Sequence, residues 1–175
     1  KEVSETEIEN LRKEHDLPDR FIFYPAQFWP HKNQLNLVKA LAILKEKGIT
    51  VPTGFVGSKR EEWGAFQKIS EFIKTRGMEA DVKFLGYVSN NEMSVLYRAA
   101  TALAMPTFLG PTNIPVYEAW FMECPVLYSD IRGPREQAGD AAILFDPYKP
   151  ESIASAIEKI WLNEPLRKEL IAKGQ

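Results

Sequence analysis

FIFYPAQFWPHKNQLNLVKALAILKEKG, residues 21–48, is the stretch that decides the fold. It opens with an apolar run closed by a proline, which is typical of a buried strand. Farther along, Leu37, Leu41 and Leu44 recur at helical spacing until a glycine ends the pattern, which predicts a helix. A strand followed by a loop and a helix is the unit from which parallel sheets are built.

The same unit repeats along the rest of the chain. Further strands are predicted at residues 52–57, 82–85, 102–105, 125–128 and 141–145. Further helices are predicted at residues 61–76, 90–100, 116–122, 151–162 and 164–173, with a short polar lead-in helix within residues 1–20. Because the apolar strands lack strict polar alternation, the sequence predicts an α/β class fold, a Rossmann-like parallel sheet with helices on both faces. Ligands bind such sheets at the carboxyl ends of the strands, so the loops after strands should carry the chemistry.

Composition narrows the ligand classes. The 175 residues include 22 Lys and Arg against 24 Asp and Glu, which gives a net charge of −2. This balance argues against a protein that binds nucleic acid or anionic membranes in general, because such proteins need a basic surface. It does not exclude a small anionic ligand, because a few local groups can hold one phosphate. A single cysteine, Cys124, excludes an internal disulfide or a thiolate zinc site, and is interpreted as a small buried apolar residue. The chain has no run of 18 apolar residues and no charged-then-apolar leader, so neither a membrane span nor a signal peptide is predicted.

The loop after the first strand, residues 25–33, leads directly into a helix. Lys32 stands at this helix start, where a cation is electrostatically disfavoured unless an anion shares the site. A solvated surface lysine is the commoner alternative. His31 is expected to pack or to form hydrogen bonds and not to act as a base.

The loop in residues 106–120 is more informative. Pro115 is expected in the first turn of a helix, so that the N–H groups of Asn113 and Ile114 point outward as an anion site. Glu118 lies one turn deeper and has two interpretations: complementing the helix dipole, or accepting hydrogen bonds from a vicinal diol such as a ribose. Together, an anion site and a diol site would hold a nucleoside diphosphate.

A third loop lies in residues 84–91. Main-chain groups at Tyr87 and Val88 are placed to read the edge of a base. An ordinary strand-to-helix turn capped by Asn90 and Asn91 is an equally open interpretation.

In order and spacing, four sequence blocks resemble the C-terminal, donor-binding half of GT-B-fold glycosyltransferases of the retaining family-4 type, the glycosyl transferases group 1. The blocks are PAQFWPHKN at 25–33, VKFLGYVSNNEM at 82–93, PTFLGPTNIPVYEAW at 106–120 and CPVLYSDIRGPREQAGDAAILFDP at 124–147. The resemblance implies one half of a GT-B fold. Residues 1–20 would then be a remnant of the interdomain connection and residues 21–175 the donor-binding domain, with the N-terminal acceptor domain outside this chain.

The resemblance also implies roles for single residues. Lys32 matches a lysine that neutralises the donor diphosphate, and Glu118 matches the second of two glutamates, which binds the ribose; these two are the implied catalytic residues. Two positions depart from the pattern: Gln27 falls where many members have an arginine, and Gly110 falls where the first glutamate touches the transferred sugar.

Backbone groups are implied to complete the site. Tyr87 and Val88 match the segment whose backbone contacts the base. The backbone of one loop is expected to replace the absent glutamate toward sugar and phosphate; its residues are Gly110, Pro111, Thr112, Asn113 and Ile114.

The implied activity is transfer of a hexose from a GDP- or UDP-sugar to an acceptor hydroxyl with retention, for example a mannosyltransferase-like step in polysaccharide or glycolipid synthesis. No metal or other cofactor is required, and no Asp-x-Asp pair occurs. The expected partners are the nucleotide sugar and the N-terminal domain of the same protein. The expected location is the cytoplasm. Association with the inner face of the membrane would involve the N-terminal domain outside this chain. The domain alone is expected to bind nucleotide without turnover.

The block at residues 129–147 is expected to support the site without forming it. Gly133 and Pro134 are expected to reverse the chain, and Arg135 and Glu136 to form a solvated pair.

Three alternatives remain open from the sequence. A nucleotide-sugar epimerase would use the same fold but needs acid and base groups that are not evident. A non-catalytic nucleotide or sugar-phosphate binding module is favoured by Gln27 and Gly110. A flavodoxin-like signalling domain would need an acidic cluster after the first strand, which this sequence lacks.

Overall fold

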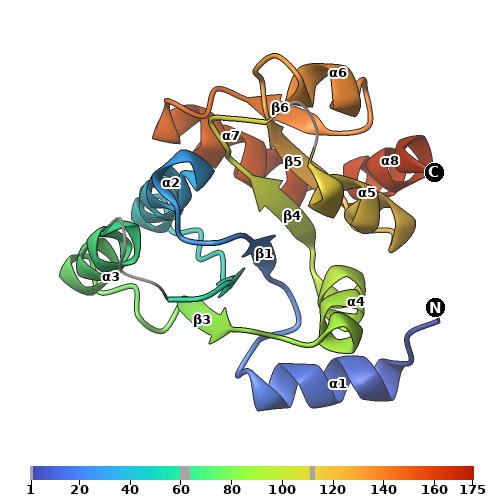
Figure 1. The fold of residues 1–175 in the computed structure, drawn as a ribbon, viewed down its shortest axis with the longest axis horizontal. Coiled ribbons are helices and arrows are strands. Elements are labelled where there is room, and N and C mark those ends of the chain that lie inside the picture. Colours follow the sequence, from blue (N-terminus) through green and yellow to red (C-terminus); the bar gives the residue numbers. More distant parts are fainter. Residues whose placement is uncertain (1, 60–63, 111–112) are drawn as a thin grey trace.

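A computed structural model describes residues 2–59, 64–110 and 113–175. Its centre is a parallel sheet of six strands in the order β3-β2-β1-β4-β5-β6 (Figure 1). The strands are β1 Ile22–Pro25, β2 Thr53–Val56, β3 Val82–Gly86, β4 Ala102–Met105, β5 Val126–Ser129 and β6 Ile143–Phe145. The predicted Rossmann-like sheet is confirmed. Strand order reverses between β1 and β4, so the crevice at their carboxyl ends is where such sheets bind ligands.

Helices cover both faces of the sheet. Their bounds are α1 Glu5–Glu14, α2 Gln34–Glu46, α3 Ala65–Thr75, α4 Asn90–Ala99, α5 Ile114–Phe121, α6 Pro134–Ala138, α7 Pro150–Trp161 and α8 Glu164–Gly174, with a 3-10 turn at Pro30–Lys32. On one face α2 packs against α3 and α7, and on the other α1 packs against α4 while α5 packs against α4 and α8. Figure 1 shows α2 and α3 on one side of the strands and α4 and α5 on the other.

The central strands are buried on both faces, which explains their continuous apolar sequences. Ile22, Phe23 and Tyr24 in β1 are each 0% exposed. The Phe23 ring meets Tyr97 of α4 edge to face, with centroids 4.9 Å apart. A residue of β1 thereby fixes a side chain of α4 that reaches the ligand-binding edge.

The predicted lead-in helix is present as α1. Ser4 and Glu7 form a capping box at its start, and Ile8 and Leu11 are buried. That residues 1–20 belong to an interdomain connection remains a prediction.

Local capping differs from expectation at two places. Helix α4 is capped by Ser89, whose side chain accepts from the Glu92 N–H while Glu92 accepts from the Ser89 N–H, so the cap is not Asn90 or Asn91.

Gly133 and Pro134 do not simply reverse the chain: Pro134 opens the five-residue helix α6. A helix this short has too few periodic positions to be seen in the sequence. The predicted helix at 61–76 is described from Ala65, and residues 61–63 lie outside the described residues.

Cys124 should be chemically inert in the folded chain. It is fully buried between α5 and β5, and burial raises the pKa of its thiol to about 12. Because only the thiolate reacts, we expect no labelling by a thiol reagent at pH 8 under native conditions and one equivalent after denaturation. Rapid labelling of the native chain would contradict this burial.

Candidate functional site

A hollow of about 400 Å³ opens at the carboxyl ends of β1, β2 and β3 and is closed by α4 and α5. It is called here the β1–β3 hollow. Its lining includes Gln27, Ser58, Tyr87, Val88, Tyr97 and Glu118. Four residues singled out in three separate loops of the sequence, Gln27, Tyr87, Val88 and Glu118, are therefore brought to one cavity.

Glu118 is held by a hydrogen bond from the core. The Tyr97 hydroxyl donates to Glu118 Oε2 at 2.7 Å. Burial and the neighbouring carboxylate raise the pKa of Tyr97, so the phenol keeps its proton and remains a donor. Glu118 itself is solvent-exposed, and its Oε1 has no hydrogen-bond partner among the described residues. One carboxylate oxygen is thus anchored and the other is available to a ligand.

The loops after β1 and β2 approach each other closely beside this cavity. A Cβ at Gly57, whose φ is +153°, would lie 2.2 Å from the Ala26 carbonyl oxygen, so only glycine fits. Across this contact, Gln27 Oε1 accepts from the Ser58 N–H at 3.3 Å. Gln27 therefore reaches the hollow as a neutral amide.

Tyr87 and Val88 lie in the same hollow but differ in exposure. The Tyr87 side chain is 89% exposed, whereas Val88 is 6% exposed and belongs to the core. Only the Tyr87 ring is free to cover a ligand with its side chain.

Lys32 lies in the 3-10 turn after β1, two residues before α2 begins. The buried Tyr24 hydroxyl donates to the Lys32 carbonyl at 2.8 Å, which fixes the backbone. In the described part of the chain, its ammonium has no hydrogen bond and no ion-pair partner. Partial burial lowers the pKa of Lys32. A desolvated cation without a counter-charge favours a bound anion.

Asn33 joins the loops that surround Lys32. It is 5% exposed and adopts the left-handed conformation, with φ +61°. Its Nδ2 donates to the carbonyl of Pro106 at 2.7 Å and to that of Pro147 at 2.8 Å. The Phe108 N–H also donates to the His31 carbonyl at 2.8 Å. The loops after β1, β4 and β6 are therefore fixed to one another at the point where strand order reverses.

The start of α5 differs from the sequence-based expectation. The Asn113 N–H does not point outward but donates to Gln137 Oε1 at 3.0 Å, and Gln137 Nε2 donates to the Asn113 carbonyl at 3.1 Å. The Tyr128 hydroxyl also donates to Gln137 Oε1, at 2.8 Å. The Ile114 N–H, at the solvent-exposed first residue of α5, has no described partner and is the amide left for an anion. The predicted Pro111 and Thr112 lie outside the described residues.

Sequence reasoning missed Gln137 as a residue that shapes the site. Nothing in a lone glutamine signals that it will bind the backbone of residue 113, 24 positions earlier. Through these bonds the 129–147 block positions the backbone at the start of α5. That the block supports the site without forming it stays a prediction. The expected pair of Arg135 with Glu136 is wrong, because Arg135 pairs with Asp130 at 2.5 Å.

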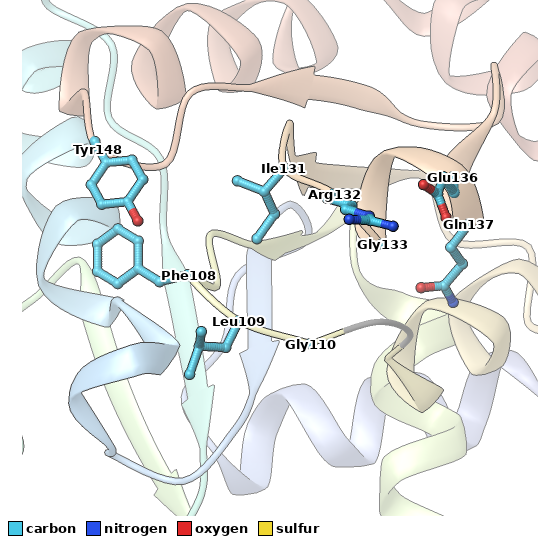
Figure 2. A pocket seen from close by; sticks show the side chains of 9 residues that line it. All are labelled: Phe108, Leu109, Gly110, Ile131, Arg132, Gly133, Glu136, Gln137 and Tyr148. Atoms are coloured by element: carbon cyan, nitrogen blue, oxygen red, sulfur yellow. The ribbon is translucent and has the colours of Figure 1, made fainter.

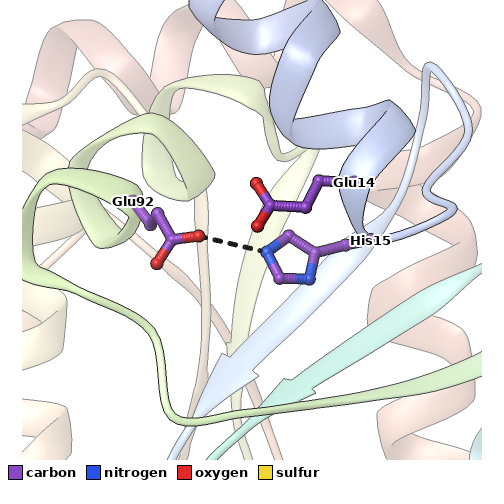
Figure 3. Close-up of side chains that lie close together, drawn as sticks. All are labelled: Glu14, His15 and Glu92. Carbon is purple, nitrogen blue, oxygen red and sulfur yellow. Dashed lines mark hydrogen bonds and ion pairs between the residues drawn. The ribbon is translucent and has the colours of Figure 1, made fainter.

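The sequence predicts no metal site, and one trio of described side chains is of metal-binding type: Glu14, His15 and Glu92, where α1 meets α4 (Figure 3). His15 Nε2 lies 3.4 Å from Glu92 Oε1. The Ser89 N–H bond lowers the pKa of Glu92 and uses its other oxygen. The two contacts of Glu92 therefore have a structural explanation: one caps α4 and the other joins α4 to α1.

Comparisons with known proteins identify the family to which this fold and site belong. The family model for glycosyl transferases group 1 matches residues 7–175. O-antigen chain mannosyltransferase B of Escherichia coli is 27% identical over 88% of this chain and 40% of its own length. The chain therefore spans less than half the length of this relative.

Two solved structures share the fold. Alr3699/HepE of Anabaena, in complex with UDP and glucose, superposes with a TM-score of 0.85 at 23% identity, over 98% of this chain and 47% of that one. The C-terminal domain of the glycosyl transferase group 1 family protein LpcC of Francisella tularensis superposes with a TM-score of 0.80 at 16% identity, over 94% of this chain and 87% of that one.

Among the described residues, no helix is both long enough and apolar enough to cross a membrane. The match over nearly the whole chain, on a sheet with its ligand loops at the β1–β4 switch, shows that this chain belongs to the glycosyl transferases group 1, with the fold of one half of a GT-B glycosyltransferase.

Proposed function

We propose that residues 21–175 bind the nucleotide-sugar donor of a retaining hexosyltransferase, and that the acceptor is bound mainly by a domain outside this chain. The observation that carries the proposal is the anchored carboxylate of Glu118 in the β1–β3 hollow. Lys32, which is not among the residues that line this hollow, supports the proposal as an uncompensated cation on the loop after β1. One relative is named a mannosyltransferase and one similar structure is a complex with UDP and glucose, and both names support a UDP- or GDP-hexose as donor.

In the proposed pose, each part of the donor meets one group of this chain. The base lies against the Tyr87–Val88 segment, and the ribose hydroxyls donate to the free oxygen of Glu118. The diphosphate lies between the Lys32 ammonium and the Ile114 N–H at the α5 start. Gln27 adds hydrogen bonding but no charge.

The chemical step breaks the bond between the anomeric carbon and the diphosphate oxygen and forms one to the acceptor oxygen, while the acceptor's hydroxyl proton passes to the leaving diphosphate. Negative charge grows on the leaving diphosphate, so a fixed cation and a fixed N–H there lower the barrier by preorganised electrostatics. We propose that no metal or other cofactor takes part. To test the proposal, the complete protein is incubated with UDP- and GDP-hexoses and an acceptor, and NMR identifies the anomeric configuration of the product. We expect retention; inversion, or no nucleoside diphosphate release with any donor, would contradict it.

A non-catalytic binding module is a second candidate, favoured by the neutral Gln27 and the side-chain-free Gly110. It would bind nucleoside diphosphates as tightly as the first candidate but release none from nucleotide sugars. The same assay therefore separates the two.

Glu118→Ala should lower the affinity for a nucleoside diphosphate by about 10- to 100-fold, because a charge-assisted hydrogen bond is worth about 1.5–3 kcal/mol. Tyr97→Phe keeps the carboxylate but frees it to move, so we expect a smaller loss, about threefold to tenfold. Calorimetry on each variant measures both. Phe121→Ala, an exposed aromatic change on the same helix, is the control. Equal affinities for all three variants would remove Glu118 from the site.

A further inference from the structure

A closed ring of hydrogen bonds, formed by Gln137, Tyr128 and Asn113, holds the start of α5. We propose that Gln137 is a positioning residue for the transfer reaction: through the backbone of Asn113 it sets the direction in which the Ile114 N–H points toward the donor diphosphate. This inference rests on the proposed function, which supplies the diphosphate.

Gln137 pairs with both backbone groups of Asn113. Its Oε1 accepts from the Asn113 N–H at 3.0 Å, and its Nε2 donates to the Asn113 carbonyl at 3.1 Å. That carbonyl belongs to the same planar peptide group as the Ile114 N–H, and in a trans peptide the two point in opposite directions. A hydrogen bond that orients the carbonyl therefore also orients the Ile114 N–H, which has no partner among the described residues.

Tyr128 anchors the Gln137 amide to the sheet. It lies in β5, paired with Met105 of β4 and Leu144 of β6, and is 0% exposed. Its hydroxyl donates to Gln137 Oε1 at 2.8 Å. Burial raises the pKa of Tyr128 to about 12, so the hydroxyl keeps its proton at neutral pH and remains a donor. The orientation of the amide is thereby referred to the rigid core of the sheet.

The Asn113 side chain closes the ring. Its Nδ2 donates to the Tyr128 hydroxyl oxygen, so the bonds run from Asn113 through Tyr128 and Gln137 back to the Asn113 N–H. Hydrogen bonds linked in this way polarise and strengthen one another. Asn113 stands at the N-cap of α5, where an asparagine usually caps the helix with its side chain, but here it makes no capping bond. The ring therefore replaces the usual cap.

The ring lies at the edge of the sheet where ligands bind. Gln137 and Gly110 line a hollow of about 860 Å³ at the carboxyl ends of β4, β5 and β6. Figure 2 shows the Gln137 side chain reaching from α6 toward the loop that carries Gly110. Gln137 Oε1 already accepts two hydrogen bonds within the ring, which fills both of its acceptor sites. The amide oxygen is thus used to hold the backbone and not to bind the donor.

Gln137→Met keeps the length of the side chain and removes its hydrogen bonds. In the complete protein we expect kcat with a nucleotide sugar to fall by about 10- to 100-fold, because a misplacement of about 1 Å can cost about 10²-fold. The KM for the nucleotide sugar should change by less than about threefold, because the lost orientation matters most where charge develops in the transition state. Gln67→Met, the same change at an exposed residue of α3, is the control and should leave both constants unchanged.

NMR of the 175-residue chain follows the Ile114 amide directly. Saturating UDP or GDP should shift its resonance in the wild-type chain, and the shift should be smaller in Gln137→Met. Tyr128→Phe keeps the pairing of Gln137 with Asn113 but removes its anchor, so it should reduce the shift and kcat in the same direction by a smaller amount. Melting temperatures of all variants ensure that each is compared while folded, and Tyr128→Phe carries the test if Gln137→Met does not fold.

An unchanged kcat in the folded variants would overturn the proposal. Tighter binding of the nucleoside diphosphate by Gln137→Met would also overturn it, because Gln137 would then compete with the diphosphate for the Asn113 N–H instead of positioning its neighbour. A failure of the proposed function is separately visible: the wild-type chain itself would bind no nucleoside diphosphate, and its Ile114 resonance would not move.

Discussion

Lys32→Ala is expected to lower the rate of sugar transfer in the complete enzyme by about 10²- to 10³-fold, the usual cost of removing one preorganised group from a developing negative charge. The ammonium has no described counter-ion of its own, so its charge is available to a diphosphate. Steady-state kinetics with a nucleotide sugar measures the loss. Full activity of the variant would contradict the assigned role.

Stability separates this role from a structural one. Because burial lowers the pKa of Lys32, the folded state binds the proton more weakly than the unfolded state, and this group's contribution to stability increases as pH rises. Removing the charge should therefore not lower the melting temperature at neutral pH. Lys74→Ala, on exposed α3 surface, is the control for general charge effects. A rate loss that follows a loss of folded protein would indicate that Lys32 is structural.

Asn33→Ala is expected to destabilise the fold by about 3–5 kcal/mol. The buried Pro106 carbonyl loses its donor, at about 1–3 kcal/mol. The Pro147 carbonyl loses one of its two donors, at about 1 kcal/mol, because Asn36 still donates to it. Alanine at φ +61° adds about 1 kcal/mol. For a chain of this size the melting temperature should fall by about 10 °C. Chemical denaturation gives the free energy directly.

Asn36→Ala is the matched control for this prediction. Asn36 Nδ2 donates a single bond, of 3.0 Å, to the same Pro147 carbonyl, so its loss should cost about 1 kcal/mol. Asn33→Gly tolerates positive φ and isolates the hydrogen-bond term. An Asn33→Ala chain within about 1 kcal/mol of wild type would show that the three loops hold together without it.

The fold was predictable because its signals are local and repeated. Apolar runs such as residues 21–24 read as strands buried on both faces, and helical spacing such as that of Leu37, Leu41 and Leu44 marks the covering helices. The pairing of β1 with both β2 and β4 is compatible with right-handed crossovers, but the local patterns do not specify this strand order.

Only one feature of the site was predictable from the sequence: which loops follow strands and therefore meet at the same edge of the sheet. That Gln27, Tyr87 and Glu118 share one cavity follows from the loops' common place at one sheet edge. Other contacts depend on side-chain geometry that the order of the loops does not specify. They are the hydrogen bonds of Asn33, the hydrogen bond from the Asn113 N–H to Gln137 and the ion pair of Arg135 with Asp130. A single sequence carries no periodic signal for such contacts.

Binding of a nucleoside diphosphate to these 175 residues is the most direct test of a donor-binding domain. Calorimetric titration with UDP, GDP and ADP should show one of them binding at a single site, with affinity lowered by Lys32→Ala and by Glu118→Ala. Absence of saturable binding for all three at millimolar concentration, with the chain folded, would contradict the assignment of this crevice to a nucleotide sugar.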